Sequence, residues 1–462
     1  MKKSWKWICL LLLCATMLTS CGTVLNVMPA ATTANQVVRR MNARLASLDG
    51  YRIDVEGTIT AYAGTTKVTG TLEGFAIEDQ GKNKDDYYYH TEMTNRSKTN
   101  NANVTIKTTE AYYDGYAYSH YSEGSTWRKL CSPMTKKEYL DYISDDSLFE
   151  LETDDCKSRQ FEKAEDGYTV NYADYSTDAI EDFFEKMDLD EDLFGKMPED
   201  LKITITTDAD YYPKTFTFEM VFEENKNSYY KPEFSMTMTF SQFNEVERKT
   251  NSLSPDKYKE IESLALLEEV EELINDRIDA KEGSFTTETR ASVNFMSQSN
   301  TETETNKVTF SRNKQGFTFE TEVTKKDDSQ HISYSNGEKT IRYSDDKTYT
   351  TKMSEDDAEK FIAELLNDPV MGYHKNYVAD IKATEDGYEI SMDVGESAAL
   401  GQIITSAGAK FSSGSHTIKI KVEDGKITKI EHGYRASGTV QIGINQKATL
   451  NYTGSMIVTF DK

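Results

Sequence analysis

The sequence predicts an α+β fold built from two tandem copies of an antiparallel sheet with a few helices. Two observations lead to this prediction. Along most of the chain, apolar and polar residues alternate with a period of two, which is typical of antiparallel strands with one buried and one solvated face. The order of turns, capped helices and strands also repeats after about 220 residues. Each copy then has about 200 residues, which is enough to bury its own core.

The chain opens with a segment that has the layout of an export signal. Lys2, Lys3 and Lys6 begin it, an apolar run over residues 5–17 forms its centre, and small residues follow. The apolar run is shorter than the roughly 20 residues that span a bilayer. We therefore expect residues 1–20 to be a signal peptide that is removed, rather than a retained transmembrane anchor.

Positions 18–21 read Leu-Thr-Ser-Cys, with a leucine three positions before a cysteine and small residues between them. This pattern resembles the lipobox of bacterial lipoprotein signals at each of its four positions. The resemblance implies cleavage before Cys21 and a diacylglycerol on its sulfur. Two or more acyl chains, such as palmitate, hold a protein firmly at a membrane. We expect the mature chain to sit on the extracytoplasmic face of the cell membrane, anchored through Cys21.

The acidic composition argues against one class of partner. The formal net charge is −25, and it becomes −28 once residues 1–20, with three lysines and no acids, are removed. A chain this acidic is repelled by nucleic acid and by anionic lipid surfaces. We therefore expect no nucleic-acid partner and regard the charge as a source of solubility at the cell surface.

Two cysteines, Cys131 and Cys156, remain once the signal and the lipidated cysteine are set aside. An exported chain can form disulfides, but the second copy has no equivalent pair, so the fold cannot depend on a bridge. Spacing alone does not fix connectivity. The sequence is therefore compatible with two alternatives, a disulfide between Cys131 and Cys156 or two separate thiols.

The first copy, residues 34–246, follows a short tether over residues 21–33 that shows no periodicity. The sequence first predicts a helix with apolar residues from Val37 to Leu48, which Gly50 ends, and then alternating strands. A hairpin turn at Asp114-Gly115 and a helix capped by Thr135 and Glu138 follow. The copy closes with a turn at Asp166-Gly167, a short helix over 177–187, and strands over 216–222 and 234–240.

The second copy, residues 254–462, follows a polar linker over 247–253. Ser254 and Pro255 predict the N-cap and first position of a helix whose apolar stripe ends at Ile278. Three landmarks of the first copy return 219 to 222 residues later: the turn as Asn336-Gly337, the capped helix as Ser354 with Asp357, and Glu165 to Tyr168 as Glu385 to Tyr388. A helix over 396–407 and three closing strands follow. Such a common offset indicates a tandem duplication.

This lipobox, element order and periodicity resemble the bacterial lipoprotein carriers and related mycobacterial lipoproteins, the LolA/LppX-like group. The resemblance implies that each copy is a curved, unclosed half-barrel capped by helices, with an apolar cavity that receives acyl chains. It is architectural and carries no position over to this chain except Cys21. A tandem arrangement also departs from the single-domain carriers, and a tethered duplicate is equally suited to sensing or scaffolding.

No motif for catalysis, a metal or a cofactor is recognisable. The six histidines are never closer than 16 residues, and no pair of cysteines has the spacing of a zinc site. Asp188, Asp190 and Asp192 alternate as in a calcium loop, but Leu193 stands where such a loop needs glycine. We therefore expect no catalytic residues, no metal, no cofactor and no enzymatic activity, with an envelope hydrolase as the less favoured alternative.

Matching short helices and an aromatic hairpin supply the candidates for ligand contact, although ordinary core packing is the favoured alternative for all of them. These candidates are Phe183, Phe184, Ile403, Ile404, Tyr116 and Tyr118. The sequence thus predicts a membrane-anchored lipoprotein that binds an apolar or lipid ligand, or an envelope protein. An interaction or sensor module with filled cores is the main alternative.

Overall fold

The computed structural model describes residues 30–63, 66–81, 86–99, 103–123, 126–144, 156–180, 198–222, 232–326, 328–395, 399–443 and 446–461. The predicted signal peptide, Cys21, Asp188 to Asp192, Phe183 and Phe184 lie outside these residues. Among the described helices, none is long and apolar enough to cross a membrane.

The chain divides into two compact units. The first unit comprises Met1–Gly124 and Pro133–Lys259, and the second comprises Ser125–Ser132 and Glu260–Lys462. The border thus falls between Lys259 and Glu260, and the predicted linker over 247–253 belongs to the first unit.

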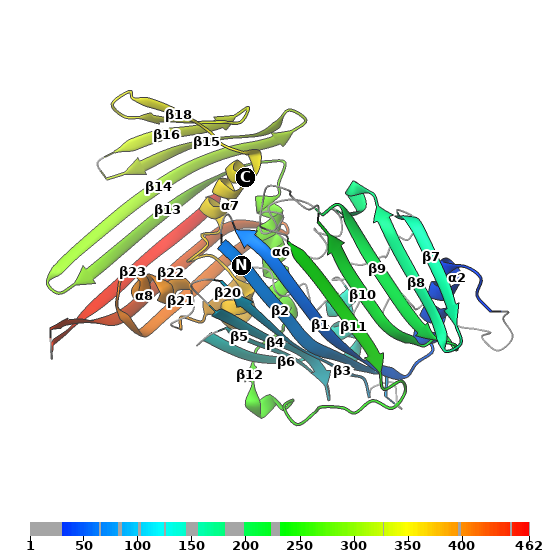
Figure 1. Cartoon of the computed structure of the whole chain (residues 1–462). Helices are drawn as coiled ribbons and strands as arrows, with labels where there is room; N and C mark the ends of the chain where they lie inside the picture. The colour runs from blue at the N-terminus through cyan, green and yellow to red at the C-terminus, as the bar shows by residue number, and fades with distance from the viewer. Residues whose placement is uncertain are drawn as a thin grey trace. The chain divides into compact units, whose positions relative to one another are not determined.

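The described part of the first unit contains one long sheet and the helices α2 and α3 (Figure 1), together with a helical turn over residues 177–180, where the predicted helix over 177–187 begins. Its elements are α2 (Ala34–Leu45), β1 (Gly50–Ala63), β2 (Thr66–Asp79), β3 (Tyr88–Lys98), β4 (Asn103–Tyr113), β5 (Tyr116–Glu123), α3 (Lys136–Ser144), β7 (Cys156–Ala164), β8 (Gly167–Tyr175), β9 (Asp200–Asp208), β10 (Pro213–Val221) and β11 (Glu233–Ser241). The strand order is β5-β4-β3-β2-β1-β11-β10-β9-β8-β7.

The second unit repeats this plan. Its elements are β6 (Thr126–Pro133, which ends at the border of the units), α6 (Ala265–Ile278), β13 (Glu282–Phe295), β14 (Gln298–Asn313), β15 (Gly316–Lys325), β16 (Ser329–Ser335), β17 (Glu338–Tyr343), β18 (Thr348–Lys352), α7 (Glu355–Leu366), β19 (Val378–Thr384), β20 (Gly387–Met392), α8 (Ala399–Ser406), β21 (Lys410–Glu423), β22 (Lys426–Gly443) and β23 (Gln446–Phe460). Its main sheet has the order β18-β17-β16-β15-β14-β13-β23-β22-β21-β20-β19.

The predicted fold class is confirmed. In each unit the first strand of the copy pairs with the last strand, β1 with β11 and β13 with β23, so the two sheets have the same topology. All the described pairings between neighbouring strands are antiparallel, and neither order closes on itself. Figure 1 shows each sheet as a curved, open surface.

The predicted turns and caps are also confirmed. Asp114-Gly115 and Asn336-Gly337 both have positive φ at both positions and connect paired strands, as the tight hairpin turn requires. The Thr135 hydroxyl accepts from the Glu138 N–H at 3.2 Å, and the Glu138 carboxylate accepts from the Thr135 N–H at 2.8 Å. The Ser354 hydroxyl likewise accepts from the Asp357 N–H at 3.1 Å.

Two helix boundaries differ from the prediction. Ser254 and Pro255 open only a 3-10 turn over Pro255–Lys257, and the helix α6 begins at Ala265. The extended stretch between them contains a short strand, β12 (Lys259–Glu260), and the Ile261 N–H there donates to the Cys131 carbonyl at 2.9 Å. The apolar stripe therefore includes strand-edge and loop residues. The helix α2 ends at Leu45, before the predicted stop at Gly50.

We call the face of each sheet that carries alternate core residues its inner face; Ile53 and Phe285 lie on it, and helices cover part of it. The helix α2 contacts β7 and β8 in the first unit. In the second unit α7 contacts β15, α8 contacts β21 and β22, and α6 contacts β19 and β22. Each unit therefore has a helical layer on one side of its sheet.

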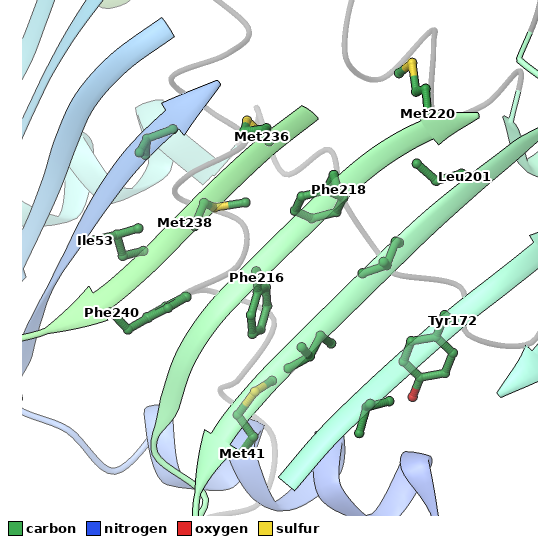
Figure 2. Close-up of a cluster of buried hydrophobic side chains, with 14 of the residues drawn as sticks. Met41, Ile53, Tyr172, Leu201, Phe216, Phe218, Met220, Met236, Met238 and Phe240 are labelled. Atoms are coloured by element: carbon green, nitrogen blue, oxygen red, sulfur yellow. The ribbon is translucent and has the colours of Figure 1, made fainter. Parts of the chain in front are cut away.

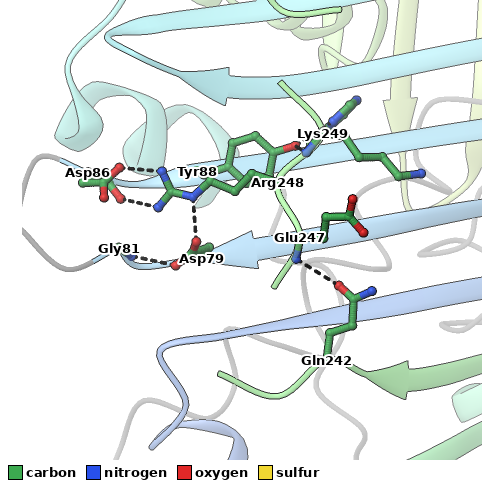
Figure 3. A network of polar contacts seen from close by, with 9 residues as sticks. Asp79, Gly81, Asp86, Tyr88, Gln242, Glu247, Arg248 and Lys249 are labelled. Carbon is green, nitrogen blue, oxygen red and sulfur yellow. Dashed lines mark hydrogen bonds and ion pairs between the residues drawn. The ribbon is translucent and has the colours of Figure 1, made fainter. Parts of the chain in front are cut away.

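The stretch predicted as a linker lies on the outer face of the first sheet (Figure 3). Arg248 Nε donates to Asp79 Oδ2 at 2.6 Å, and its guanidinium also pairs with Asp86. The Lys249 N–H donates to the Tyr88 hydroxyl at 2.8 Å, and Lys249 Nζ lies 3.8 Å from the centre of the Phe75 ring. These contacts bind the stretch to β2 and β3.

Candidate binding cavity

The inner face of the second sheet changes from apolar to polar as it passes from β20 to β15. Directly paired residues of antiparallel strands place their side chains on the same face. One such row, in order from β20 to β15, is Ile390, Ile418, His432, Met456, Thr289, Glu304 and Lys325. The neighbouring row is Ile420, Ile430, Val458, Thr287, Asn306 and Val323. The polar residues are concentrated on β13 and β14.

A cavity of about 570 Å³ lies over this polar part of the sheet. One wall comes from β13, β14 and β23, and the other comes from the last turn of α7 and the chain that follows it. The sheet side includes Thr287, Thr289, Ala291, Glu302, Glu304, Asn306 and Met456, whereas the helix side includes Glu364, Leu365, Asp368 and Met371. This volume falls within the usual range for small-ligand sites.

A chain of polar contacts fixes the sheet wall. Asn306 Nδ2 donates to Thr287 Oγ1 at 3.1 Å and to Glu304 Oε1 at 2.9 Å. Lys325 Nζ lies 3.0 Å from the other carboxylate oxygen of Glu304. Glu304 raises the pKa of Lys325 through this hydrogen bond and its charge, so Lys325 is protonated at neutral pH. Asn306 and Thr287 are both buried, which makes this wall rigid.

The opposite wall is positioned by Asp368. Its Oδ1 accepts from the N–H groups of Val370 and Met371, both at 2.7 Å, which holds the turn that follows α7. The buried Met371 side chain reaches the sheet, where the Tyr452 hydroxyl donates to its sulfur at 3.8 Å. Met371 and Met456 together give the cavity an apolar end.

Two buried histidines lie beside this apolar end without lining the cavity. His432 is the direct cross-strand partner of Met456, and its Nδ1 lies 3.4 Å from His416 Nε2. Burial lowers the pKa of His416 to about 4 and that of His432 to about 3. Both rings are therefore neutral at physiological pH and act as core residues.

The inner face of the first sheet carries a packed core over β10 and β11. Figure 2 shows side chains of β10 and β11 side by side with Met41 of α2 nearby. Phe218 and Met238 are fully buried, and Met236 and Met41 are 2% exposed. Phenylalanine and methionine thus occupy this face as a packed core.

The duplication allows the two inner faces to be compared position by position. The Ile53–Phe240 pair of β1 and β11 corresponds to the Phe285–Phe460 pair of β13 and β23. Counting along the paired strands from there, Thr287 corresponds to Val55, Asn306 to Gly74, Thr289 to Gly57 and Glu304 to Leu72. The second copy therefore has polar side chains at four positions where the first copy has apolar residues or glycine.

None of the described candidates from the sequence lines the cavity. Ile404 is buried at the α8–β22 contact, where a Cβ on Gly438 would lie 2.3 Å from its side chain, and Ile403 is half-buried. Tyr118 is buried, with its ring centre 5.0 Å from that of Tyr258, and Tyr116 is half-buried beside it.

The sequence prediction missed the lining residues of the cavity. The available signal was the loss of apolar residues at alternate positions after Phe285, where Thr287 and Thr289 follow. A strand-by-strand alignment of the two copies would have highlighted these positions. The residues from α7 and its following turn gave no such signal, because only the tertiary fold brings them to the sheet.

Cys131 and Cys156 are both buried thiols in the structure. Burial raises the pKa of the Cys131 thiol to about 11. Among the described residues, no group of three histidine, cysteine, aspartate or glutamate side chains has the geometry of a metal site.

No family model and no curated protein matches this sequence. Among solved structures, the chain is similar to a domain from Vibrio parahaemolyticus assigned to outer membrane lipoprotein sorting, with 6% identity, a TM-score of 0.16, and 42% of this chain and 90% of that chain covered. It is also similar to the translocator domain of the autotransporter NalP from Neisseria meningitidis, with 8% identity, a TM-score of 0.11, and 93% and 96% covered. Similarity at this level identifies no family.

Proposed function

We propose that this protein is a lipid-anchored extracytoplasmic binding protein, not an enzyme, and that it holds a small ligand in the cavity of its second unit. The observation that carries the proposal is the cavity of about 570 Å³ between α7 and the sheet strands β13 and β14. Its wall contains the four polar residues that distinguish the second copy from the first.

The comparison between the copies favours binding over a purely structural role. A buried polar residue in a sheet core destabilises the fold unless it is hydrogen-bonded, whereas an apolar residue stabilises it. Val55 and Leu72 represent the apolar solution in this same chain. Thr287, Asn306 and Glu304 are instead linked to one another beside an open space, where polar groups can fix the orientation of a ligand.

The cavity chemistry favours binding over catalysis. Glu304 is engaged by Lys325 and Asn306, so it is poorly placed to take a proton from a substrate. Lys325 is protonated and cannot serve as a base or nucleophile. The remaining lining residues provide hydrogen bonds and charge, which orient a ligand.

The anchor is tested first by replacing Cys21 with alanine. We expect the wild-type protein to fractionate with membranes and Cys21→Ala to be released into the soluble fraction, because the acyl chains can no longer attach. A Cys131→Ala variant is the control and should stay with membranes. Membrane association of Cys21→Ala would contradict the anchor.

The cavity is tested with the chain from Gly22, which retains every residue that the structure describes. Thr289→Phe would place a ring in the cavity, whereas the matched control Thr318→Phe lies on the exposed outer face of β15. Native mass spectrometry after expression in bacteria, followed by solvent extraction, should detect one bound small molecule per chain in wild type and Thr318→Phe but not in Thr289→Phe. An empty wild-type protein that stays empty with envelope extracts would favour the interaction module with filled cores.

A further inference from the structure

We infer that the ligand is a small cationic amphiphile, with an ammonium or guanidinium group at one end and an aliphatic part at the other. This inference rests on the proposed function, since it concerns the same cavity, and it assigns the chemical class that the cavity recognises. It also departs from the acyl-chain cargo that the sequence resemblance implies.

The charge of the lining is negative. Five carboxylates face two lysines around the cavity: Glu302, Glu304, Asp328, Glu364 and Asp368 against Lys325 and Lys326. Low-dielectric walls lined by one sign of charge raise the local concentration of the opposite ion. A ligand that enters therefore meets a field that favours a positive group.

Existing contacts determine which carboxylates can receive that group. Glu304 is engaged by Lys325, and Asp328 accepts from Ser344 Oγ at 3.0 Å and Gln330 Nε2 at 3.2 Å. Glu302 accepts a long hydrogen bond of 3.4 Å from Asn300 Nδ2, and it lies on the inner face directly opposite Ala291, whose small side chain leaves room beside the carboxylate. Glu364 reaches the cavity from α7 on the other wall. Glu302 and Glu364 are thus the carboxylates best placed to bind a cation.

The other end of the cavity is apolar and adaptable. Met371 and Met456 are both buried there. Methionine side chains are flexible and polarisable, so they fit aliphatic groups of different shapes. An aliphatic part placed here would keep the polar end of the ligand at the carboxylates.

The register gives the approximate length of the ligand. Met456 lies on β23 and Glu302 lies on β14, with β13 between these two strands. Neighbouring strands are about 4.8 Å apart, so the apolar and acidic ends are separated by about 10 Å. An eight-carbon chain with one polar end has about this length.

An anionic amphiphile fits poorly in this cavity. A carboxylate or phosphate would face several glutamates, and Lys325 is already neutralised by Glu304 at 3.0 Å. Like charges in close contact are unfavourable and select against the wrong ligand. The lining therefore discriminates among amphiphiles by the charge of the head group.

The experiment compares octylamine, octanol and octanoate, which share a chain and differ in head-group charge. Binding to the chain from Gly22 is measured by isothermal titration calorimetry below the concentration at which the probes aggregate. We expect octylamine to bind about tenfold more tightly than octanol and octanoate to bind least. The preference for octylamine should decrease as salt is added.

Charge-neutral variants test the assigned residues. The double variant Glu302→Gln with Glu364→Gln should lose the tenfold preference for octylamine while octanol binding is unchanged. The control Glu322→Gln, on the exposed outer face of β15, should behave as wild type.

The outcomes separate this inference from the proposed function. Equal binding of all three probes, or tightest binding of octanoate, with loss of binding in Thr289→Phe, would overturn the cationic ligand and keep the binding cavity. Failure of all three probes to bind would overturn this inference, whereas the proposed function is overturned by an empty wild-type protein in native mass spectrometry. A preference for octylamine that persists in the double variant would overturn the assignment to Glu302 and Glu364.

Discussion

His416 Nε2 lies 3.4 Å from His432 Nδ1 on the inner face of the second sheet, and both rings are nearly inaccessible to solvent. Their ring planes are 29° apart with centres separated by 5.7 Å. Two imidazoles this close cannot both be positively charged without strong repulsion in a low-dielectric environment. Burial also lowers the pKa of each ring, so both histidines are neutral in the folded protein at physiological pH.

The first prediction is that acidification destabilises the second unit. Burial lowers the pKa of His416 to about 4 and of His432 to about 3, whereas an unfolded histidine titrates near 6.5. Below pH 6.5 the unfolded chain therefore binds more protons than the folded chain. The free energy of unfolding decreases as the pH is lowered, until the pKa values of the folded state are reached. Between pH 7 and 5 the loss is about 2 kcal/mol for each histidine.

Urea unfolding followed by circular dichroism at pH 7 and pH 5 measures this loss. In the double variant His416→Gln with His432→Gln the stability should vary much less with pH than in wild type, whatever its absolute value. The control His331→Gln replaces an exposed histidine and should keep the wild-type pH dependence. An unchanged pH dependence in the double variant would contradict the prediction.

The second prediction concerns Gly387, which follows the turn that the sequence repeat revealed. Its φ is +140°, and a Cβ there would lie 2.2 Å from the carbonyl oxygen of Ile420. We expect Gly387→Ala to lower the free energy of unfolding by about 2–4 kcal/mol, through both strain and the clash. Gly425→Ala is the matched control, because its φ is +73° and the space around it is open. Gly425→Ala should lower the free energy of unfolding by only about 1 kcal/mol. Equal losses in Gly387→Ala and Gly425→Ala would show that the chain relieves the clash at Gly387.

The third prediction tests the contacts of the stretch over 247–253. Arg248→Ala leaves the partly buried Asp79 without its ion pair, so we expect a loss of about 1–3 kcal/mol in the free energy of unfolding. Arg342→Ala removes an exposed pair with Asp346 and should change stability by less than about 0.5 kcal/mol. Urea unfolding of both variants makes the comparison. Equal stability of Arg248→Ala and wild type would mean that this stretch contributes little to the first unit.

The fourth prediction concerns Cys131 and Cys156, the two cysteines that follow Cys21 in the chain. Cys131 and Cys156 are thiols in the structure, and burial raises the pKa of Cys131 to about 11, which disfavours the reactive thiolate. A thiol reagent should therefore react with the native chain from Gly22 orders of magnitude more slowly than with the urea-unfolded chain. In the unfolded chain, kept without reductant, the reagent should detect two reactive thiols per chain. Zero equivalents would establish a disulfide between Cys131 and Cys156.

Much of the fold follows from local signals in the sequence. Alternation along strands such as 216–222, tight turns such as Asp114-Gly115, and capping residues such as Thr135 act over a few residues, so they can be read directly. The duplication was visible because these local signals recur at a constant offset. The sequence was less reliable where tertiary contacts compete, as after Ser254, where the chain pairs with the carbonyl of Cys131 before α6 begins.

The candidate site depended on tertiary structure. Thr287 and Glu304 were visible as polar residues in strands, but their partners Glu364, Asp368 and Met371 are 60 to 84 residues away in the chain. Only the packing of α7 against β15 brings the two groups to one cavity. The sequence by itself therefore determined the repeated topology through local periodicity and turns. The tertiary structure decided where the inner faces are packed and where the second unit keeps a cavity, because that depends on side-chain volumes summed across several strands and a helix.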